Sequence, residues 1–194
     1  MTTLQSAEIA QAMQCFDQAR ARVRNVTNGL SDAQWRFKPA PDRWSIAQIL
    51  EHMVLVQERV FGRVTEQLPQ CPAPPPERNN QQIDRVVMEK IPDRTHKAKA
   101  PEFLEPTGQL SPSEAFNRMD ANYRRLTDYI RTTPDLREHI LEAPPLRVVT
   151  DGAYTTMDGY QWALTVARHD ERHVLQILEV QQHPEYPRQA AAAQ

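Results

Sequence analysis

Two histidines, His169 and His173, occur close together near the C-terminus, in the run A-R-H-D-E-R-H-V-L-Q-I. A spacing of four residues places two side chains on one face of a helix, about 6 Å apart. Two imidazoles in this position can bind one metal ion, but a catalytic zinc site generally has three protein ligands and one open position. If the pair binds a metal, we therefore expect a third ligand from another part of the chain.

His52, in the run I-L-E-H-M, is the candidate for this third ligand. It follows Ile49 by three residues and precedes Val56 by four, which places it on or beside the apolar face of its helix. The other histidines lie in a charged loop, in a connection and at a helix end: His96, His139 and His183. Three buried imidazoles without partners are costly, and a shared metal removes that cost. The alternative is that the three histidines are ordinary core residues.

Metalloprotease motifs do not fit this histidine pair. In H-E-x-x-H a glutamate follows the first histidine, where this chain has Asp170, and H-x-x-E-H needs a glutamate where this chain has Arg172. Asp170 and Glu171 point about 100° and 200° away from His169 around the helix. We interpret both as a solvated face or as partners of neighbouring arginines.

The elements that position these histidines are long helices. Apolar residues at intervals of three and four predict helices over residues 5–28, 45–68, 111–133 and 158–183. Ser45, Ser111 and Asp158 are suitable N-caps, each with Gln or Glu three residues later. These helices predict an all-α fold, a four-helix bundle, and the length of two connections predicts that at least one crosses the bundle.

We expect a single domain over residues 1–188, followed by a disordered tail at 189–194. The connection over residues 69–110 begins with a proline-rich run at 69–80 and includes one short helix at 81–90. We interpret the rest of it as a surface spacer without chemistry.

Composition excludes several classes of protein. The chain has 194 residues with 23 basic and 25 acidic side chains, so the basic stripe of a nucleic-acid-binding protein is not expected. Two cysteines form no disulfide framework and suit a reducing compartment. Neither a signal peptide nor an apolar run of about 18 residues is visible. We therefore predict a cytoplasmic protein without a nucleic-acid or membrane partner.

Two stretches resemble the DinB-like superfamily: W-S-I-A-Q-I-L-E-H at residues 44–52, and W-A-L-T-V-A-R-H-D-E-R-H-V-L-Q-I at 162–177. The resemblance extends over roughly residues 5–185. This superfamily includes YfiT-like metal-dependent hydrolases and transferases that use bacillithiol or mycothiol. The resemblance implies a four-helix bundle with crossover connections and a metal triad at His52, His169 and His173. The proline-rich insertion departs from the family pattern, so the substrate is not implied.

Three neutral histidines leave the charge of a divalent metal intact. Such a metal lowers the pKa of bound water toward 7, or binds a thiol as its thiolate. We therefore expect hydrolysis or thiol transfer on a small-molecule substrate, with a low-molecular-weight thiol as a possible cosubstrate. Zinc is the first expectation for the metal, with nickel or iron as alternatives. Two other hypotheses stay open: a metal-binding or stress-response protein without turnover, and a metal-free bundle that binds a ligand.

Other residues near the candidate ligands have two interpretations each. Gln48 and Thr165 precede His52 and His169 by one turn and are candidates to support the ligands, but Gln48 is equally suited to the helix cap. Glu51 is interpreted as a surface residue. The two tryptophans at the helix starts are interpreted as core residues, with a pocket wall as the alternative: Trp44 and Trp162. A homodimer is also expected.

Overall fold

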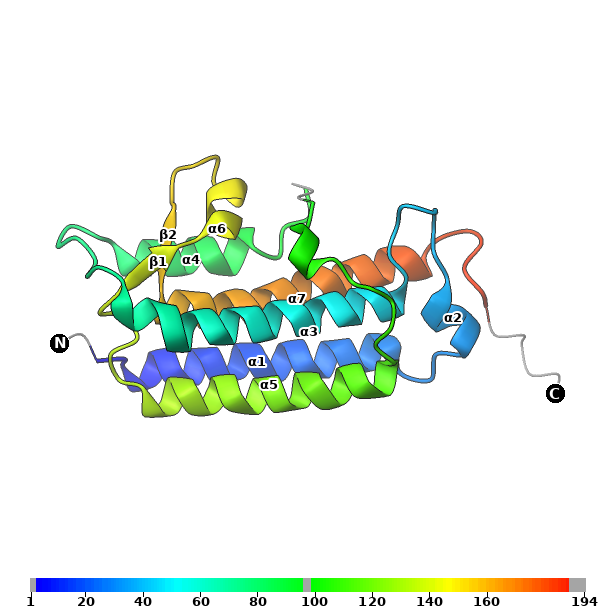
Figure 1. Ribbon diagram of the computed structural model, residues 1–194, viewed down its shortest axis with the longest axis horizontal. Coiled ribbons are helices and arrows are strands. Elements are labelled where there is room, and N and C mark those ends of the chain that lie inside the picture. Colours follow the sequence, from blue (N-terminus) through cyan, green and yellow to red (C-terminus); the bar gives the residue numbers. More distant parts are fainter. Residues whose placement is uncertain (1–2, 96–98, 189–194) are drawn as a thin grey trace.

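The computed structural model describes residues 3–95 and 99–188. The predicted tail at 189–194 and His96 lie outside the described residues. Four long helices form the body of the molecule: α1 (Ser6–Thr27), α3 (Ile46–Gly62), α5 (Pro112–Thr132) and α7 (Gly159–Gln181). The predicted four-helix bundle is therefore confirmed (Figure 1).

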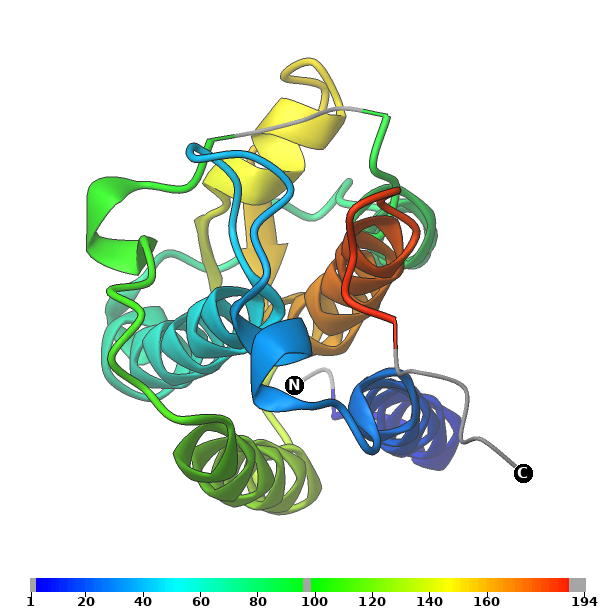
Figure 2. The same ribbon diagram turned by 90° about the vertical axis from the view of Figure 1, so that its right-hand side faces the viewer.

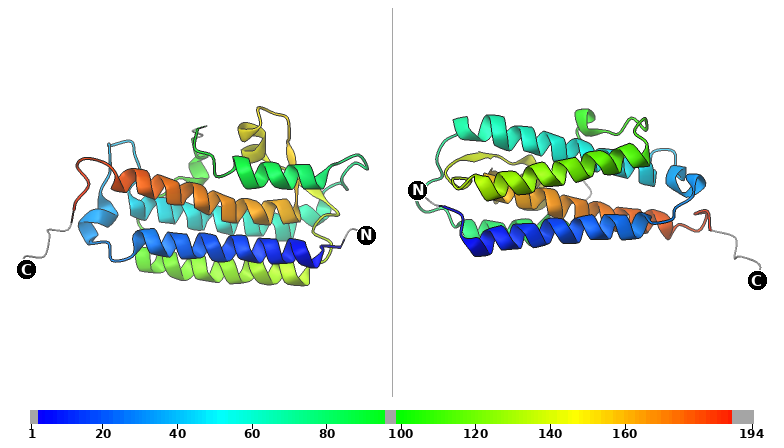
Figure 3. Two further views of the ribbon diagram at one scale, coloured as in Figure 1. Left: turned by 180° about the vertical axis from the view of Figure 1, so that it is seen from behind. Right: turned by 90° about the horizontal axis from the view of Figure 1, so that it is seen from below.

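The four helices pack as two layers, with α3 and α7 in one and α1 and α5 in the other (Figure 2). Helix α1 packs against α7, and α3 packs against both α5 and α7. The colour gradient in Figures 1 and 3 shows that α1 and α7 run in one direction, while α3 and α5 run in the other. Because α3 and α5 are parallel, the chain between them must return along the whole bundle, as the length of that connection predicts.

The helices begin at the predicted caps. The backbone N–H of Gln48 donates to Ser45 Oγ at 3.3 Å, and that of Gln161 donates to Asp158 Oδ1 at 2.7 Å. Each cap satisfies one of the four N–H groups that a helix N-terminus leaves without a partner. The same arrangement at Ser111 begins α5.

Smaller elements cover the α3–α7 layer. They are α4 (Asn80–Lys90), α6 (Pro144–Val149) and an antiparallel pair of strands, β1 (Ile140–Glu142) and β2 (Thr156–Asp158), whereas α2 (Asp32–Arg36) lies at one end of the bundle (Figure 1). The strands are not predicted from the sequence, since three residues are too few to show an alternating pattern. The short helix predicted at 81–90 is confirmed as α4.

Helix α7 is enclosed on most of its circumference. Every residue from Gly159 to Ala167 is buried, because α1, α3 and α4 all pack against this helix. Asp170 and Glu171 are buried as well, so their interpretation as a solvated face is wrong. The hydrogen-bond partners that the described residues give both carboxylates lie on other helices. Asp170 contacts Tyr123 and Gln57, and Glu171 forms an ion pair with Arg22 of α1.

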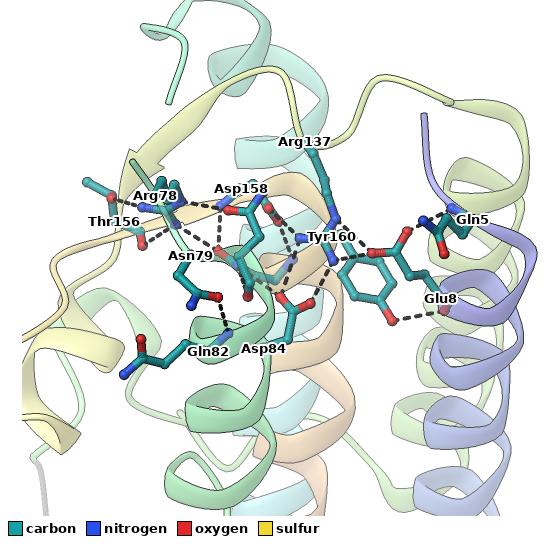
Figure 4. Close-up of polar contacts among 12 residues, drawn as sticks. Gln5, Glu8, Arg78, Asn79, Gln82, Asp84, Arg137, Thr156, Asp158 and Tyr160 are labelled. Atoms are coloured by element: carbon teal, nitrogen blue, oxygen red, sulfur yellow. Dashed lines mark hydrogen bonds and ion pairs between the residues drawn. The ribbon is translucent and has the colours of Figure 1, made fainter. Parts of the chain in front are cut away.

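One buried arginine joins three elements at the end of the bundle where α7 begins (Figure 4). Arg137, with 3% of its side chain exposed, forms ion pairs with Glu8 of α1, Asp84 of α4 and the cap residue Asp158. Its guanidinium also lies 4.5 Å from the centre of the Tyr160 ring. This arrangement fixes the N-terminus of α7 relative to the two helices beside it.

In the described part of the chain, no helix combines the length and the apolar character that crossing a lipid bilayer requires.

Candidate metal centre

His52, His169 and His173 meet where α3 packs against α7. One ring nitrogen of each residue lies within 4.8 Å of the corresponding atoms of the other two. The two Nε2 atoms of His169 and His173 are 3.0 Å apart, and the ring of His52 is centred 4.8 Å from that of His173. The structure thus brings together the three histidines selected from the sequence, although His52 and His169 are 117 positions apart along the chain.

The surroundings keep all three rings neutral. His52 and His173 are buried, and 18% of the His169 side chain is exposed. Burial lowers the pKa of His52 to about 4 and that of His169 to about 3. Burial also lowers the pKa of His173 well below 6.5. At neutral pH each ring therefore has a lone pair on one nitrogen, which is the form that binds a metal.

Hydrogen bonds select the ring nitrogen that is free on two of these histidines. His52 Nδ1 lies 2.7 Å from the carbonyl oxygen of Leu104, and His173 Nδ1 lies 2.8 Å from Gln176 Oε1. Both partners are acceptors, so the proton of each ring is on Nδ1 and the lone pair is on Nε2. Metal-binding histidines are commonly oriented by a carbonyl or side-chain oxygen in this way.

The third ring shows why a metal fits this site. With the lone pair of His173 on Nε2, the 3.0 Å contact requires His169 Nε2 either to donate a proton or to share a cation with it. Proton donation leaves His169 Nδ1 as a buried lone pair, and this atom has no hydrogen-bond partner among the described residues. A shared cation instead leaves the His169 proton on Nδ1, 3.9 Å from Asp170 Oδ1, and tetrahedral bonds of about 2.1 Å place two ligand nitrogens about 3.4 Å apart, close to the observed spacing. The donor set therefore fits a divalent metal.

A buried carboxylate lies behind His169. Asp170 Oδ1 is 3.9 Å from His169 Nδ1, and it too has no hydrogen-bond partner among the described residues. The other oxygen accepts hydrogen bonds from Tyr123 Oη at 2.6 Å and from Gln57 Nε2 at 2.9 Å. Burial raises the pKa of Asp170 to about 7, and its two donors oppose this shift. A carboxylate behind a histidine ligand is a common way to orient the ring.

The two residues expected to support the ligands form hydrogen bonds within their own helices, which for Gln48 is the cap role expected as the alternative. Gln48 is part of the helix cap, where its Oε1 accepts from the backbone N–H of Ser45 at 3.1 Å. Thr165 lines the cavity beside the histidines, but its hydroxyl donates to the carbonyl oxygen of Gln161 in the preceding turn. Neither residue hydrogen-bonds a candidate ligand.

Glu51 is not a surface residue, which corrects the interpretation from the sequence. It is 6% exposed, and it accepts hydrogen bonds from the backbone N–H groups of Thr107 and Gly108 at 3.1 and 2.7 Å. These bonds attach the connection that follows α4 to helix α3. The same connection supplies the carbonyl oxygen of Leu104 to His52, so Glu51 stabilises the segment that orients this ring.

The histidines lie at the wall of a cavity of about 620 Å³ between α3, α6, α7 and the connection after α4. Trp44 and Trp162 both contribute to this wall, and the Trp44 ring is centred 4.7 Å from the ring of His52. The connection over residues 69–110 is therefore more than a spacer. Its later part lines the cavity with residues that include Arg94, Lys99, Phe103, Leu104 and Glu105.

Residues 16–177 match the family model described as the DinB superfamily. The chain belongs to the DinB superfamily. One similar protein is YuaE of Bacillus subtilis (strain 168), an uncharacterized protein that is 28% identical to this chain over 171 residues. The matched region covers 88% of this chain and 97% of YuaE. Among solved structures, YfiT from Bacillus subtilis matches with a TM-score of 0.57 and 14% identity, over 96% of this chain and 93% of YfiT.

The likeness to YfiT shows that this DinB superfamily member has the same fold. YfiT itself is described as a probable metal-dependent hydrolase with an unusual four-helix bundle topology. In the present chain the pairs α1–α7 and α3–α5 are parallel, whereas simple bundles alternate up and down.

Several residues around the histidines of this DinB protein are not predicted from the sequence. Leu104 has no signal in the sequence, because its contribution is a backbone oxygen. Asp170 does have one: it lies four residues from both Val166 and Val174, which are buried positions of α7. The same spacing that selected the histidines therefore also places this carboxylate inside the bundle.

Proposed function

We propose that the protein is a metal-dependent enzyme that acts on a small molecule, by hydrolysis or by transfer of a thiol. The observation that carries this proposal is the convergence of three neutral imidazoles on one point at the wall of a 620 Å³ cavity. His52, His169 and His173 are the proposed ligands. One divalent ion, zinc first and nickel or iron as alternatives, is the proposed cofactor.

The chain's own residues prepare the ligands and bound the reaction space. Leu104 and Gln176 hold the protons of two rings on Nδ1, which directs the Nε2 lone pairs toward the centre. The partly exposed His169 faces the cavity, so a ligand that enters the cavity reaches the centre directly. When bound, a divalent ion would act as a Lewis acid that lowers the pKa of a water molecule or of a thiol.

Metal content tests the first part of the proposal. Untagged protein, purified without chelator, is expected to contain about one zinc, nickel or iron ion per chain by inductively coupled plasma mass spectrometry. The His169→Ala variant is expected to lose most of it, because two histidines remain where a tight site takes three. His183→Ala is the matched control, since His183 lies beyond the end of the same helix and packs against Phe37. Folded wild-type protein that binds no metal even after reconstitution contradicts the proposal.

Turnover tests the second part. Metal-loaded protein is assayed with a panel of esters and amides, and with electrophiles offered together with a low-molecular-weight thiol. Hydrolysis without thiol supports the hydrolase form, and turnover that requires thiol supports the transferase form. Metal binding without turnover of any panel member supports the alternative of a non-catalytic metal-binding protein. Ligand binding by a protein that never takes up metal supports the metal-free bundle.

A further inference from the structure

Cationic side chains outnumber carboxylates around the cavity. Among the described residues that line it, the cations are Arg43, Arg59, Arg63, Arg94, Lys99 and Arg172, and the carboxylates are Asp42 and Glu105. Several of these cations have partners within the protein. Arg94 pairs with Glu179 through both carboxylate oxygens, and Lys99 lies 3.6 Å from Glu105. Arg172 donates to the carbonyl oxygen of Asp93.

Like Arg43, the pair Arg59 and Arg63 has no carboxylate within ion-pair distance in the described part of the chain, although the Glu142 carboxylate acts to raise the pKa of Arg63. The two arginines of this pair lie one turn apart on the cavity side of α3 and its π-helical extension (Arg63–Gln67). Arg59 lies 5.5 Å from the centre of the Phe103 ring, and Arg63 donates to the carbonyl oxygen of Glu142 at 2.8 Å. Two like charges four residues apart repel each other, and burial together with Arg59 lowers the pKa of Arg63.

Two buried donors at this end of the cavity have no acceptor. They are Arg63 Nε and Trp162 Nε1, neither of which has a hydrogen-bond partner among the described residues. Trp162 is only 3% exposed, and the Arg63 guanidinium lies 4.8 Å from the centre of its ring. A buried donor without an acceptor destabilises the folded protein, because it has lost its hydrogen bonds to water. An oxygen-rich group with negative charge would supply both the acceptors and the neutralising charge.

The distance from this arginine pair to the histidines defines the length of a ligand. Arg59 and Arg63 follow His52 by seven and eleven residues, which is roughly 10 to 16 Å along a helix with a rise of 1.5 Å per residue. The wall between the two ends is apolar, with Val56 and Val60 from α3 and with Val148 and Val149 from α6. A ligand that spans it therefore needs an apolar body.

From these contacts we infer that the cavity binds an elongated organic acid, whose carboxylate or phosphate is held by Arg59, Arg63 and Trp162 and whose apolar body extends toward the histidines. An elongated organic acid is thus the substrate class for the proposed function. Only the placement of the ligand's reacting end at the histidines rests on that function. Arginine suits this role because its planar guanidinium donates two parallel hydrogen bonds to a carboxylate or phosphate.

Binding of a matched pair of ligands tests this inference without any reaction. The probes are 6-phenylhexanoate and its neutral amide, 6-phenylhexanamide, measured by isothermal titration calorimetry in the presence of EDTA. The wild-type protein is expected to bind the acid at least ten-fold more tightly than the amide. Arg59→Gln and Arg63→Gln are each expected to reduce the affinity for the acid several-fold, and the double variant to abolish the preference for the acid.

Two further variants separate the acid site from general effects of substitution. Trp162→Phe keeps an aromatic side chain, although a smaller one, and removes the indole N–H; it is expected to weaken binding of the acid more than binding of the amide. Arg85→Gln is the matched control, since Arg85 is exposed on α4 and does not line the cavity, and it is expected to leave both affinities unchanged. Circular dichroism and the Tm of each variant establish that it is folded.

The result that overturns the inference is equal binding of acid and amide, or a preference for the acid that survives in the folded double variant. Acid binding that appears only when zinc replaces EDTA also overturns it, because the acid then sits at the histidines. Failure of the proposed function, as opposed to failure of the acid site, gives a different result. A protein that takes up no metal but still prefers the acid, in an Arg63-dependent way, retains the acid site and lacks the metal centre.

Discussion

At the scale of single residues, the candidate centre depends on which protons the buried groups hold. His52 and His173 donate from Nδ1 to oxygen atoms, while the facing Nε2 atoms of His169 and His173 are only 3.0 Å apart. Behind them, Asp170 is buried and is held by two donors from other helices. Burial keeps the histidines neutral and raises the pKa of Asp170, so pH and single substitutions test the arrangement directly.

The pH dependence of stability tests the neutral state of His52. Its folded-state pKa of about 4 lies below the value of 6.5 for an exposed histidine, so the unfolded chain binds more protons between these values. The free energy of unfolding of the metal-free protein therefore falls as pH decreases from 6.5 toward 4. Removing this group by His52→Gln is expected to reduce the slope by ~1 kcal/mol per pH unit between pH 6 and 5.

Urea unfolding at several pH values, with EDTA present, measures these slopes. The raised pKa of Asp170 acts in the opposite direction, because the folded state then holds a proton that the unfolded state releases. This contribution is present in both proteins, so the difference between their slopes is the relevant quantity. Identical slopes would show that His52 is not held neutral in the folded state.

The hydrogen bond from Tyr123 to Asp170 tests the buried carboxylate. Tyr123→Phe leaves Asp170 Oδ2 with only the Gln57 donor, and the loss is expected to cost ~2 kcal/mol because the acceptor is buried and ionisable. Tyr129→Phe is the control on the same helix, where a half-buried hydroxyl donates to the carbonyl oxygen of Val64, and it is expected to cost ~1 kcal/mol or less. Urea unfolding measures both, and equal costs would contradict a special role for Asp170.

At the scale of elements, the site depends on how helices α3 and α7 and the connection after α4 are held together. Glu51 attaches that connection to α3, and the connection in turn orients His52. At the other end, Arg137 attaches the start of α7 to α1 and α4 (Figure 4). These contacts join elements that are far apart in the sequence, so their loss should affect the whole bundle.

Removal of Arg137 is expected to be severe. Arg137→Met leaves Glu8, Asp84 and Asp158 close together without their shared cation, and breaking a buried ion pair of this kind costs ~3–5 kcal/mol. The control is Arg118→Met, which breaks a surface pair with Glu58 and is expected to cost ~0–1 kcal/mol. Thermal and urea unfolding measure both variants. A cost for Arg137→Met as small as that of the control would contradict the clustering of the three carboxylates around it.

At the scale of the whole molecule, the crossover topology brings the ligands together. Helices α3 and α7 lie side by side and run in opposite directions, so the first half of α3 meets the second half of α7 (Figures 1 and 2). A metal bound by His52, His169 and His173 would therefore cross-link two helices of the bundle. The homodimer and the cytoplasmic location expected from the sequence stay predictions.

Metal removal tests this cross-link. A ligand at about 100 times its Kd stabilises a folded protein by ~2.7 kcal/mol, which for a chain of this size corresponds to a Tm increase of about 5–10 °C. Differential scanning calorimetry of zinc-loaded and EDTA-treated wild-type protein is expected to show this difference. The His169→Ala variant is expected to show little of it. An equal increase in the variant would place the stabilising metal elsewhere.

The sequence by itself determines the helices, their caps and the selection of the three histidines. These features depend on intervals of three and four residues and on cap residues such as Ser45 and Asp158, which act over a single turn. Four amphipathic segments then leave a helical bundle as the economical way to bury their apolar faces.

Only the tertiary structure decides the burial of Glu51 and Glu171, the short strands and the wall of the cavity. A helical repeat in the sequence predicts one apolar face, whereas α7 packs against neighbours on three sides. Charged residues outside the predicted apolar face are therefore buried and pair with residues of other helices. The role of the connection after α4 has no signal in the sequence, because it contributes backbone atoms such as the carbonyl oxygen of Leu104. Contacts of this kind follow from the packing of distant segments, which local spacing does not encode.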